Sequence, residues 1–250
     1  GFGGSYASSR LGMEAASGGW SMTRMPELTQ RTGALAVPSA QARLWDISPP
    51  VDERTPVFPG DAAYAQRWNF RLSDDCPVNV ATVSLSPHVG AHADAPLHYD
   101  PLGEPIGGLD LQPYLGHCRV IHAMDRGGLV TWEHLRHACT DLPPRVLVRT
   151  YRCQPQTQFD MNLPAFSAAL IERLADLGVQ LIGIDSASID PANSKALPSH
   201  QAVRRRGLRV LENLLLDAVP EGDYELIALP LRWMQADASP VRAILREWHA

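Results

Sequence analysis

Alternation of apolar and polar positions predicts several strands along the chain. Residues 80–85 read Val-Ala-Thr-Val-Ser-Leu, a period-two pattern that is typical of a strand and that leads into a histidine-rich loop. Folded sequence is expected to begin at residues 44–47. Further strands are predicted where short apolar runs are bounded by charged or turn residues, at residues 118–122, 145–149, 180–184 and 224–229.

Helical periodicity separates some of these predicted strands. Apolar residues recur at helical spacing through residues 164–177, and Gly178 follows as a residue that can end a helix. A second helical pattern covers residues 131–138. Because strands and helices are mixed along the chain, we predict a single domain of the α/β class.

The first 42 residues differ in composition from the rest of the chain. They are rich in Gly, Ser, Ala and Thr and lack sustained periodicity, so we expect residues 1–42 to be a flexible leader or an expression tail. Residues 43–250 have a length that one α/β domain routinely reaches. The sequence contains no internal repeat, which excludes a solenoid.

Charge, hydropathy and cysteine usage narrow the range of partners. The formal net charge of −5 offers no basic field for phosphates, so we expect no nucleic-acid binding. No apolar run approaches the roughly 20 residues that cross a bilayer, so no membrane partner is expected. The four cysteines form no C-x-x-C pair and follow no secretory leader, which favours free thiols in the cytoplasm. The basic run at residues 204–206 is either a solvated helix face or an attraction for an acidic substrate.

Residues 88–98 have the composition of a metal site. His88, His92, Asp94 and His98 are separated only by small or apolar side chains and proline. Neutral imidazole suits zinc, and a carboxylate can bridge two ions. Three imidazoles gathered here would repel one another if protonated, so we predict metal binding and not a packing role. The remaining histidines are predicted to be structural: His117, His122, His134, His137 and His249.

A carboxylate among the ligands indicates a catalytic metal site, because closed structural zinc sites normally take four Cys or His ligands. The remaining ligands must come from distant sequence, and His200 and Glu212 are the best candidates. Glu212 interrupts an apolar run at residues 208–216, where an unpaired carboxylate would be costly to bury. The alternative is a glutamate on the polar face of a surface helix. Asp185 ends a predicted strand and is a further candidate with no assigned role.

The segment His-x-Gly-x-His-x-Asp-x-Pro-x-His resembles the signature of the cyclase-like metal-dependent hydrolases, and residues 88–98 match every fixed position. Within that family the chain is similar to the branch of bacterial kynurenine formamidases, or arylformamidases. This narrower resemblance rests on residues 44–48, 76–80, 86–99, 181–185, 223–231 and 237–242.

The resemblance implies a swivelling β/β/α fold, a homodimer and two zinc ions per subunit, with manganese as the alternative metal. It places His88, His92, Asp94 and Glu212 on one ion. Asp94 and Glu212 would hold the second ion together with His200.

The same resemblance makes His98 the proton-transferring residue. It also makes Phe58 the aromatic substrate contact, at a position where the family usually carries Trp. The implied reaction is hydrolysis of N-formyl-L-kynurenine to L-kynurenine and formate in tryptophan degradation. Two alternatives stay open: another amide hydrolase of the family, such as a manganese-dependent isatin hydrolase, or a non-catalytic metal- or metabolite-binding module. The departure at Phe58 keeps the first alternative open, and the presence of His98 argues against the second.

Overall fold

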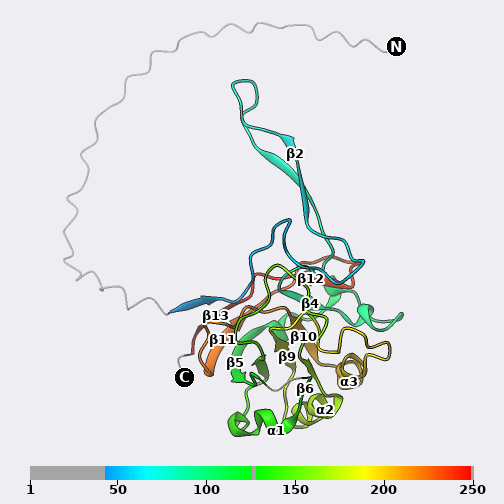
Figure 1. Ribbon diagram of the computed structural model, residues 1–250, viewed down its shortest axis with the longest axis vertical. Coiled ribbons are helices and arrows are strands. Elements are labelled where there is room, and N and C mark those ends of the chain that lie inside the picture. The colour runs from blue at the N-terminus through cyan, green and yellow to red at the C-terminus, as the bar shows by residue number, and fades with distance from the viewer. Residues whose placement is uncertain (1–42, 126–127, 249–250) are drawn as a thin grey trace, which may run out of the picture. The chain divides into compact units, whose positions relative to one another are not determined.

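Nine strands form one mixed sheet in the computed structural model, which describes residues 43–125 and 128–248 (Figure 1). In their spatial order the strands are β1 (Leu44–Asp46), β13 (Ile244–Glu247), β11 (Gly222–Ile227), β5 (Leu115–His122), β7 (Arg145–Arg149), β9 (Leu181–Ile184), β10 (Arg209–Glu212), β4 (His92–Asp94) and β12 (Ala238–Pro240). The strands β5, β7, β9 and β10 run parallel, and the other neighbours pair antiparallel.

The central sheet is buried on both faces. Since successive side chains point to opposite sides of a strand, each central strand contributes to an apolar cluster on either face. On β9, for example, Leu181 packs into one apolar cluster and Ile182 into another. The second cluster is covered by α2 (Ala168–Asp176) and α3 (Pro198–Arg206), which contribute Leu174 and Val203 to it. Figure 1 shows these two helices together with α1 (Trp132–Leu135) on the same side of the sheet.

Several short elements complete the fold. A small parallel pair consists of β6 (Leu129–Val130) and β8 (Ala165–Phe166). The 3-10 helices are η1 (Pro96–His98), η2 (Ile106–Gly108), η3 (Gln112–Tyr114) and η4 (Arg136–Ala138). In the part of the chain that the structure describes, no helix has the length and apolar character needed to cross a membrane.

The helix predicted at residues 164–177 begins later than the periodicity suggests. Ala165–Phe166 pair with another strand, and Ser167 then caps α2 by accepting a hydrogen bond from the Leu170 amide at 3.2 Å. Gly178 follows the helix with φ at +87°, as a helix-ending glycine requires. The pattern at residues 131–138 corresponds to α1 followed by η4.

The alternating strand at residues 80–85 is confirmed, as β3 (Val80–Ser84), but it lies outside the main sheet. Among the described residues it pairs with β2 (Ala65–Phe70) alone, in a hairpin, and every residue of both strands is exposed (Figure 1, cyan). Apolar side chains such as Trp68, Phe70 and Val83 are therefore open to solvent in the single chain.

The predicted domain boundary after residue 42 stays a prediction, because residues 1–42 lie outside the described residues. His249, predicted to be structural, also lies outside them. The four cysteines all lie within the described ranges, and each carries a free thiol, as expected.

Candidate metal centre

Two neighbouring strands provide three of the expected ligands. His92 and Asp94 lie two residues apart on β4, so their side chains share one face of the sheet. Glu212 ends β10 and lies directly opposite His92 in the antiparallel register. Glu212 is thus a buried strand residue, and the alternative of a surface helix glutamate is wrong.

Turn geometry brings His88 back over the same strand. Gly90 has φ at +70°, a left-handed conformation that favours glycine, and a Cβ there would lie 2.6 Å from Cγ2 of Val51. The turn also holds the Val89 amide on the Ser86 carbonyl at 3.1 Å. The backbone conformation and the close approach of Val51 therefore both require glycine at position 90.

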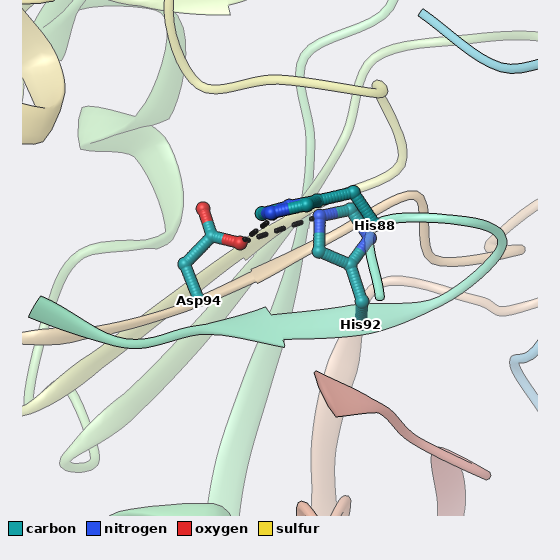
Figure 2. Close-up of side chains that lie close together, drawn as sticks. All are labelled: His88, His92 and Asp94. Carbon is teal, nitrogen blue, oxygen red and sulfur yellow. Dashed lines mark ion pairs between the residues drawn. The ribbon is translucent and has the colours of Figure 1, made fainter. Parts of the chain in front are cut away.

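The carboxylates of Asp94 and Glu212 each divide their oxygens between two groups of imidazoles. Oδ1 of Asp94 lies 3.1 Å from Nδ1 of His88 and 3.4 Å from Nε2 of His92 (Figure 2). Oδ2 of Asp94 lies 3.4 Å from Nε2 of His200. Likewise, Glu212 places Oε2 3.3 Å from His92 and Oε1 3.5 Å from His200. The structure thus brings all five expected ligands together, in two groups joined by two carboxylates.

Unpartnered polar atoms show that this donor set fits a metal. Nε2 of His92 and Oδ1 of Asp94 are buried, and among the described residues neither makes a hydrogen bond of favourable geometry, although oppositely charged groups lie near both. Buried polar groups are normally paired, and an unpaired carboxylate oxygen carries a large desolvation cost. A cation bound between imidazole nitrogens and carboxylate oxygens would satisfy both atoms.

The nitrogens of His92 and His200 that face away from the carboxylates are held by fixed acceptors. Nδ1 of His92 lies 2.9 Å from the Gly90 carbonyl, and Nδ1 of His200 lies 2.7 Å from Oδ2 of Asp190. Asp190 also accepts the backbone N–H groups of Ser199 and His200, both at 3.0 Å. When each ring is neutral, the nitrogen at the fixed acceptor would carry the hydrogen, which would leave Nε2 of both rings free to bind a metal.

His98 lies beside the five expected ligands, and its ring nitrogens are close enough to Asp94 and His200, and to His88 and Asp237, to form candidate metal-ligating groups with them. Its ring centroid is 4.3 Å from that of His88 and 5.8 Å from that of His200. Its side chain is 31% exposed, so a substrate can reach it. Nδ1 of His98 lies 3.2 Å from Oδ2 of Asp237, and the same oxygen lies 3.0 Å from Nε2 of His88.

Charges within the cluster displace the pKa values of its members. Burial alone would lower the pKa of His88, but the carboxylates of Asp94 and Asp237 outweigh it and raise that pKa to about 9. The pKa of His200 is raised well above its ordinary value, because Asp190 and its other carboxylate neighbours outweigh burial. Burial opposes the ionisation of Asp94, yet the neighbouring imidazoles hold its pKa well below its ordinary value. In the metal-free chain, protons on the imidazoles therefore balance the carboxylates.

Phe58 is not brought against the ligands. Its ring is 50% exposed and packs edge-on against Phe159, with the ring centroids 5.4 Å apart. Within the described ranges, no ring contact joins Phe58 to the site histidines. Phe159 itself lines a small pocket together with Asp185 and Asn213, the residue after Glu212.

Asp185 holds a loop. Its carboxylate accepts the backbone N–H groups of Thr150 and Tyr151, each at 2.9 Å. Burial raises the pKa of Asp185 to about 6, against the opposing effect of these hydrogen bonds. This end of β9 therefore supports the loop after β7.

The basic run at residues 204–206 forms ion pairs within the chain. Arg204 pairs with Asp100 at 2.7 Å, while the next two arginines pair with Glu172 on α2. These contacts favour the interpretation of the run as a solvated helix face.

Sequence reasoning missed two carboxylates that contact site histidines, Asp190 and Asp237. Asp190 precedes a proline and lies ten residues before its histidine partner, so neither helical nor strand spacing connects them. Asp237 stands in one of the stretches that carry the family resemblance, which was the available signal.

Comparisons with known proteins agree on the family. Residues 45–191 match the cyclase family model, described as "Putative cyclase". A kynurenine formamidase of Delftia acidovorans is 66% identical over 204 residues, which cover 82% of this chain and 97% of the relative. One from Polaromonas naphthalenivorans is 58% identical over 223 residues, covering 89% of this chain and 99% of the relative.

Solved structures agree on the fold. A predicted metal-dependent hydrolase from Bacillus stearothermophilus superposes with a TM-score of 0.71 at 24% identity, covering 84% of this chain and 100% of that one. An isatin hydrolase bound to the product analogue thioisatinate gives a TM-score of 0.72 at 21% identity, with 82% and 92% covered.

The predicted α/β fold of the cyclase-like type is thus confirmed, and so is the expectation that the chain is an amide-hydrolysing enzyme. The chain belongs to the cyclase family and, within it, to the family of the kynurenine formamidases.

Proposed function

We propose that the chain hydrolyses N-formyl-L-kynurenine to L-kynurenine and formate with two metal ions, and that His98 transfers the proton. The observation that carries this proposal is the pair of carboxylates, Asp94 and Glu212, that present one oxygen to each of two imidazole groups. The substrate class comes from relatives at 58–66% identity that are named kynurenine formamidase.

His88, His92, Asp94 and Glu212 would hold one zinc ion, and Asp94 and Glu212 would hold the other together with His200. When bound, zinc supplies a Lewis acid that lowers the pKa of water to about 7 and polarises a carbonyl oxygen. The donor set combines three imidazoles with two carboxylates, and carboxylate ligands also suit manganese. Four of these residues are buried, which keeps bulk water away from their ligand atoms: His92, Asp94, His200 and Glu212.

His98 supports this reaction through its position and its free nitrogen. An arylamide nitrogen leaves poorly without a proton, so hydrolysis needs an acid close to the scissile bond. Nδ1 of His98 faces Asp237, which leaves Nε2 to take a proton from the attacking water and pass it to the leaving nitrogen. Imidazole can take up and release a proton near neutral pH, which suits both the attack of water and the departure of the nitrogen.

Phe58 is proposed as a contact of the substrate's aromatic ring. Its half-exposed ring and its edge-on partner, Phe159, form an aromatic surface that can pack against a flat substrate. Because phenylalanine stands where the family usually carries tryptophan, this surface is smaller than usual for the family.

A homodimer is also proposed. The β2–β3 hairpin exposes apolar side chains on both strands, including Trp68, Phe70 and Val83, and exposed apolar clusters of this kind mark protein interfaces. Sedimentation equilibrium should give twice the chain mass, and a Trp68→Asp/Val83→Asp variant should give the monomer mass. A wild-type monomer at micromolar concentration would contradict the proposal.

A cytoplasmic location is proposed from the four free thiols.

The decisive experiment measures formate release from N-formyl-L-kynurenine and metal content on one preparation. We expect turnover that is lost on chelation and restored by zinc or manganese. Isatin serves as the competing substrate, since an isatin hydrolase shares the fold. Faster turnover of isatin would favour the other amide hydrolase, and metal binding without turnover of either compound would favour a binding module.

A further inference from the structure

Asp237 is anchored by its backbone beside the ligand strand. It immediately precedes β12, whose Ala238 lies opposite Asp94 in the antiparallel register. The Asp237 carbonyl accepts the Ala95 N–H at 2.8 Å, and the preceding carbonyl, of Ala236, accepts the N–H of Ile106 at 3.0 Å. The sheet therefore fixes where the Asp237 carboxylate emerges.

One oxygen of this carboxylate faces two different imidazoles. Oδ2 lies 3.0 Å from Nε2 of His88 and 3.2 Å from Nδ1 of His98. The opposite nitrogen of His88, Nδ1, faces Asp94 at 3.1 Å. When each ring is neutral, this arrangement favours an Nε2–H of His88 and an Nδ1–H of His98 directed at Asp237, which leaves Nδ1 of His88 free for a metal and Nε2 of His98 free for proton transfer.

We propose that Asp237 is a positioning residue that sets the tautomers of His88 and His98 together, and so couples a metal ligand to the proton carrier. The inference rests on the proposed function of His98 in formamide hydrolysis. A ring whose Nδ1–H is held by a carboxylate can exchange protons only at Nε2. The same contact restrains rotation of the His98 ring, which keeps Nε2 in a constant position relative to the ligands.

The contrast with Asp190 shows why Asp237 can be tested without unfolding the site. The Asp190 side chain is fully buried, so its removal would leave several buried donors unpaired. The Asp237 side chain is 41% exposed, and water can replace it as an acceptor. The Asp237→Asn variant keeps the shape and one acceptor oxygen, but it has no negative charge to hold two N–H donors at once.

Kinetics at saturating zinc test the coupling. Asp237→Asn should retain both metals and lower kcat for N-formyl-L-kynurenine by about 10- to 100-fold, with KM within about twofold of wild type. The double variant His98→Ala/Asp237→Asn should be no slower than His98→Ala, because Asp237 acts on the rate through His98. Asp223→Asn is the matched control, since Asp223 on β11 pairs with His117 on β5 at 3.0 Å, these strands carry none of the proposed ligands, and the change should leave kcat unchanged.

Three results would overturn the proposal: wild-type kcat in Asp237→Asn, loss of metal from that variant at saturating zinc, or a further loss of rate when it is added to His98→Ala. A second measurement is independent of turnover. Nitrogen NMR of ¹⁵N-histidine-labelled, zinc-loaded protein, at a pH where the rings are neutral, should show His88 with hydrogen on Nε2 and His98 with hydrogen on Nδ1.

In Asp237→Ala the preference of His98 for the Nδ1–H tautomer should be lost. A wild-type His98 with hydrogen on Nε2 would contradict the assignment directly. If the wild-type protein releases no formate, the proposed function fails, while the NMR result still decides whether Asp237 sets the two rings.

Discussion

Oδ2 of Asp190 lies 2.7 Å from Nδ1 of His200, and the same carboxylate accepts the N–H groups of Ser199 and His200 in the first turn of α3. One buried side chain thus satisfies the start of a helix and orients the imidazole that the helix carries. Leu197, directly before the helix, has a left-handed φ of 45°, so the capping contacts stabilise a strained entry.

Asp190→Asn should therefore weaken binding of the metal proposed at His200 more than binding of the metal proposed on the other side of the cluster. An amide can offer its nitrogen to the His200 ring and favour the wrong tautomer, and such changes typically cost 10- to 100-fold in metal affinity. Elemental analysis after dialysis against a weak chelator should fall from two ions per chain towards one. Asp176→Asn, on the surface of α2, is the control. Equal loss of both metals would mean that the two positions are one cooperative unit.

Asp94→Ala should lose more metal than either His88→Ala or His92→Ala. Asp94 presents Oδ1 to one imidazole group and Oδ2 to the other, whereas each histidine contributes a single nitrogen. Metal content by mass spectrometry, with zinc supplied during purification, measures the difference. Full occupancy in Asp94→Ala would rule out a bridging role.

His98→Ala should keep both metals and lose about 10²- to 10⁴-fold in rate on N-formyl-L-kynurenine, the usual contribution of general acid–base catalysis. An ester analogue whose leaving group departs without protonation should be hydrolysed at close to the wild-type rate. The exposed His137, paired with Glu221, provides the control substitution His137→Ala. Equal impairment on both substrates would make His98 a ligand or a general positioning residue.

Phe58→Ala should raise KM for N-formyl-L-kynurenine more than it lowers kcat, because an aromatic wall contacts the substrate ring in the ground and transition states alike. Phe58→Trp should give a KM at or below the wild-type value. Phe159→Ala should shift KM in the same direction but less, since its ring supports that of Phe58. The exposed Leu102→Ala is the control. A large loss of kcat at constant KM would contradict the contact.

Zinc binding should release protons below about pH 9. The pKa of His88 in the metal-free chain is raised to about 9, so at pH 7.5 the ring carries a proton that a metal must displace. Zinc affinity should therefore fall as the pH drops below 9. Above pH 9 it should depend less on pH. Calorimetry in two buffers of different ionisation enthalpy counts the protons. His88→Ala should release about one fewer proton, and an unchanged count would show that His88 is neutral before binding.

The sequence alone determined the parts of this site that depend on local spacing. The eleven-residue segment with its histidines and aspartate predicted candidate metal ligands on β4 and in the turn before it, and the cost of burying Glu212 indicated a further candidate far along the chain. Apolar runs also located the central strands, because burial on both faces leaves a continuous apolar pattern. Residue spacing is a property of one segment, so these inferences did not require knowing which distant segments of the chain pack beside it.

Only the tertiary structure decided how distant segments meet. The register of β4 between β10 and β12 brings Glu212 opposite His92 and carries Asp237 to His88 and His98. Strand pairing across more than a hundred residues leaves no periodicity in the sequence that would predict it. The apolar alternation of β3 could not show that this strand leaves the sheet, since a face buried in the core and one exposed on a hairpin have the same pattern.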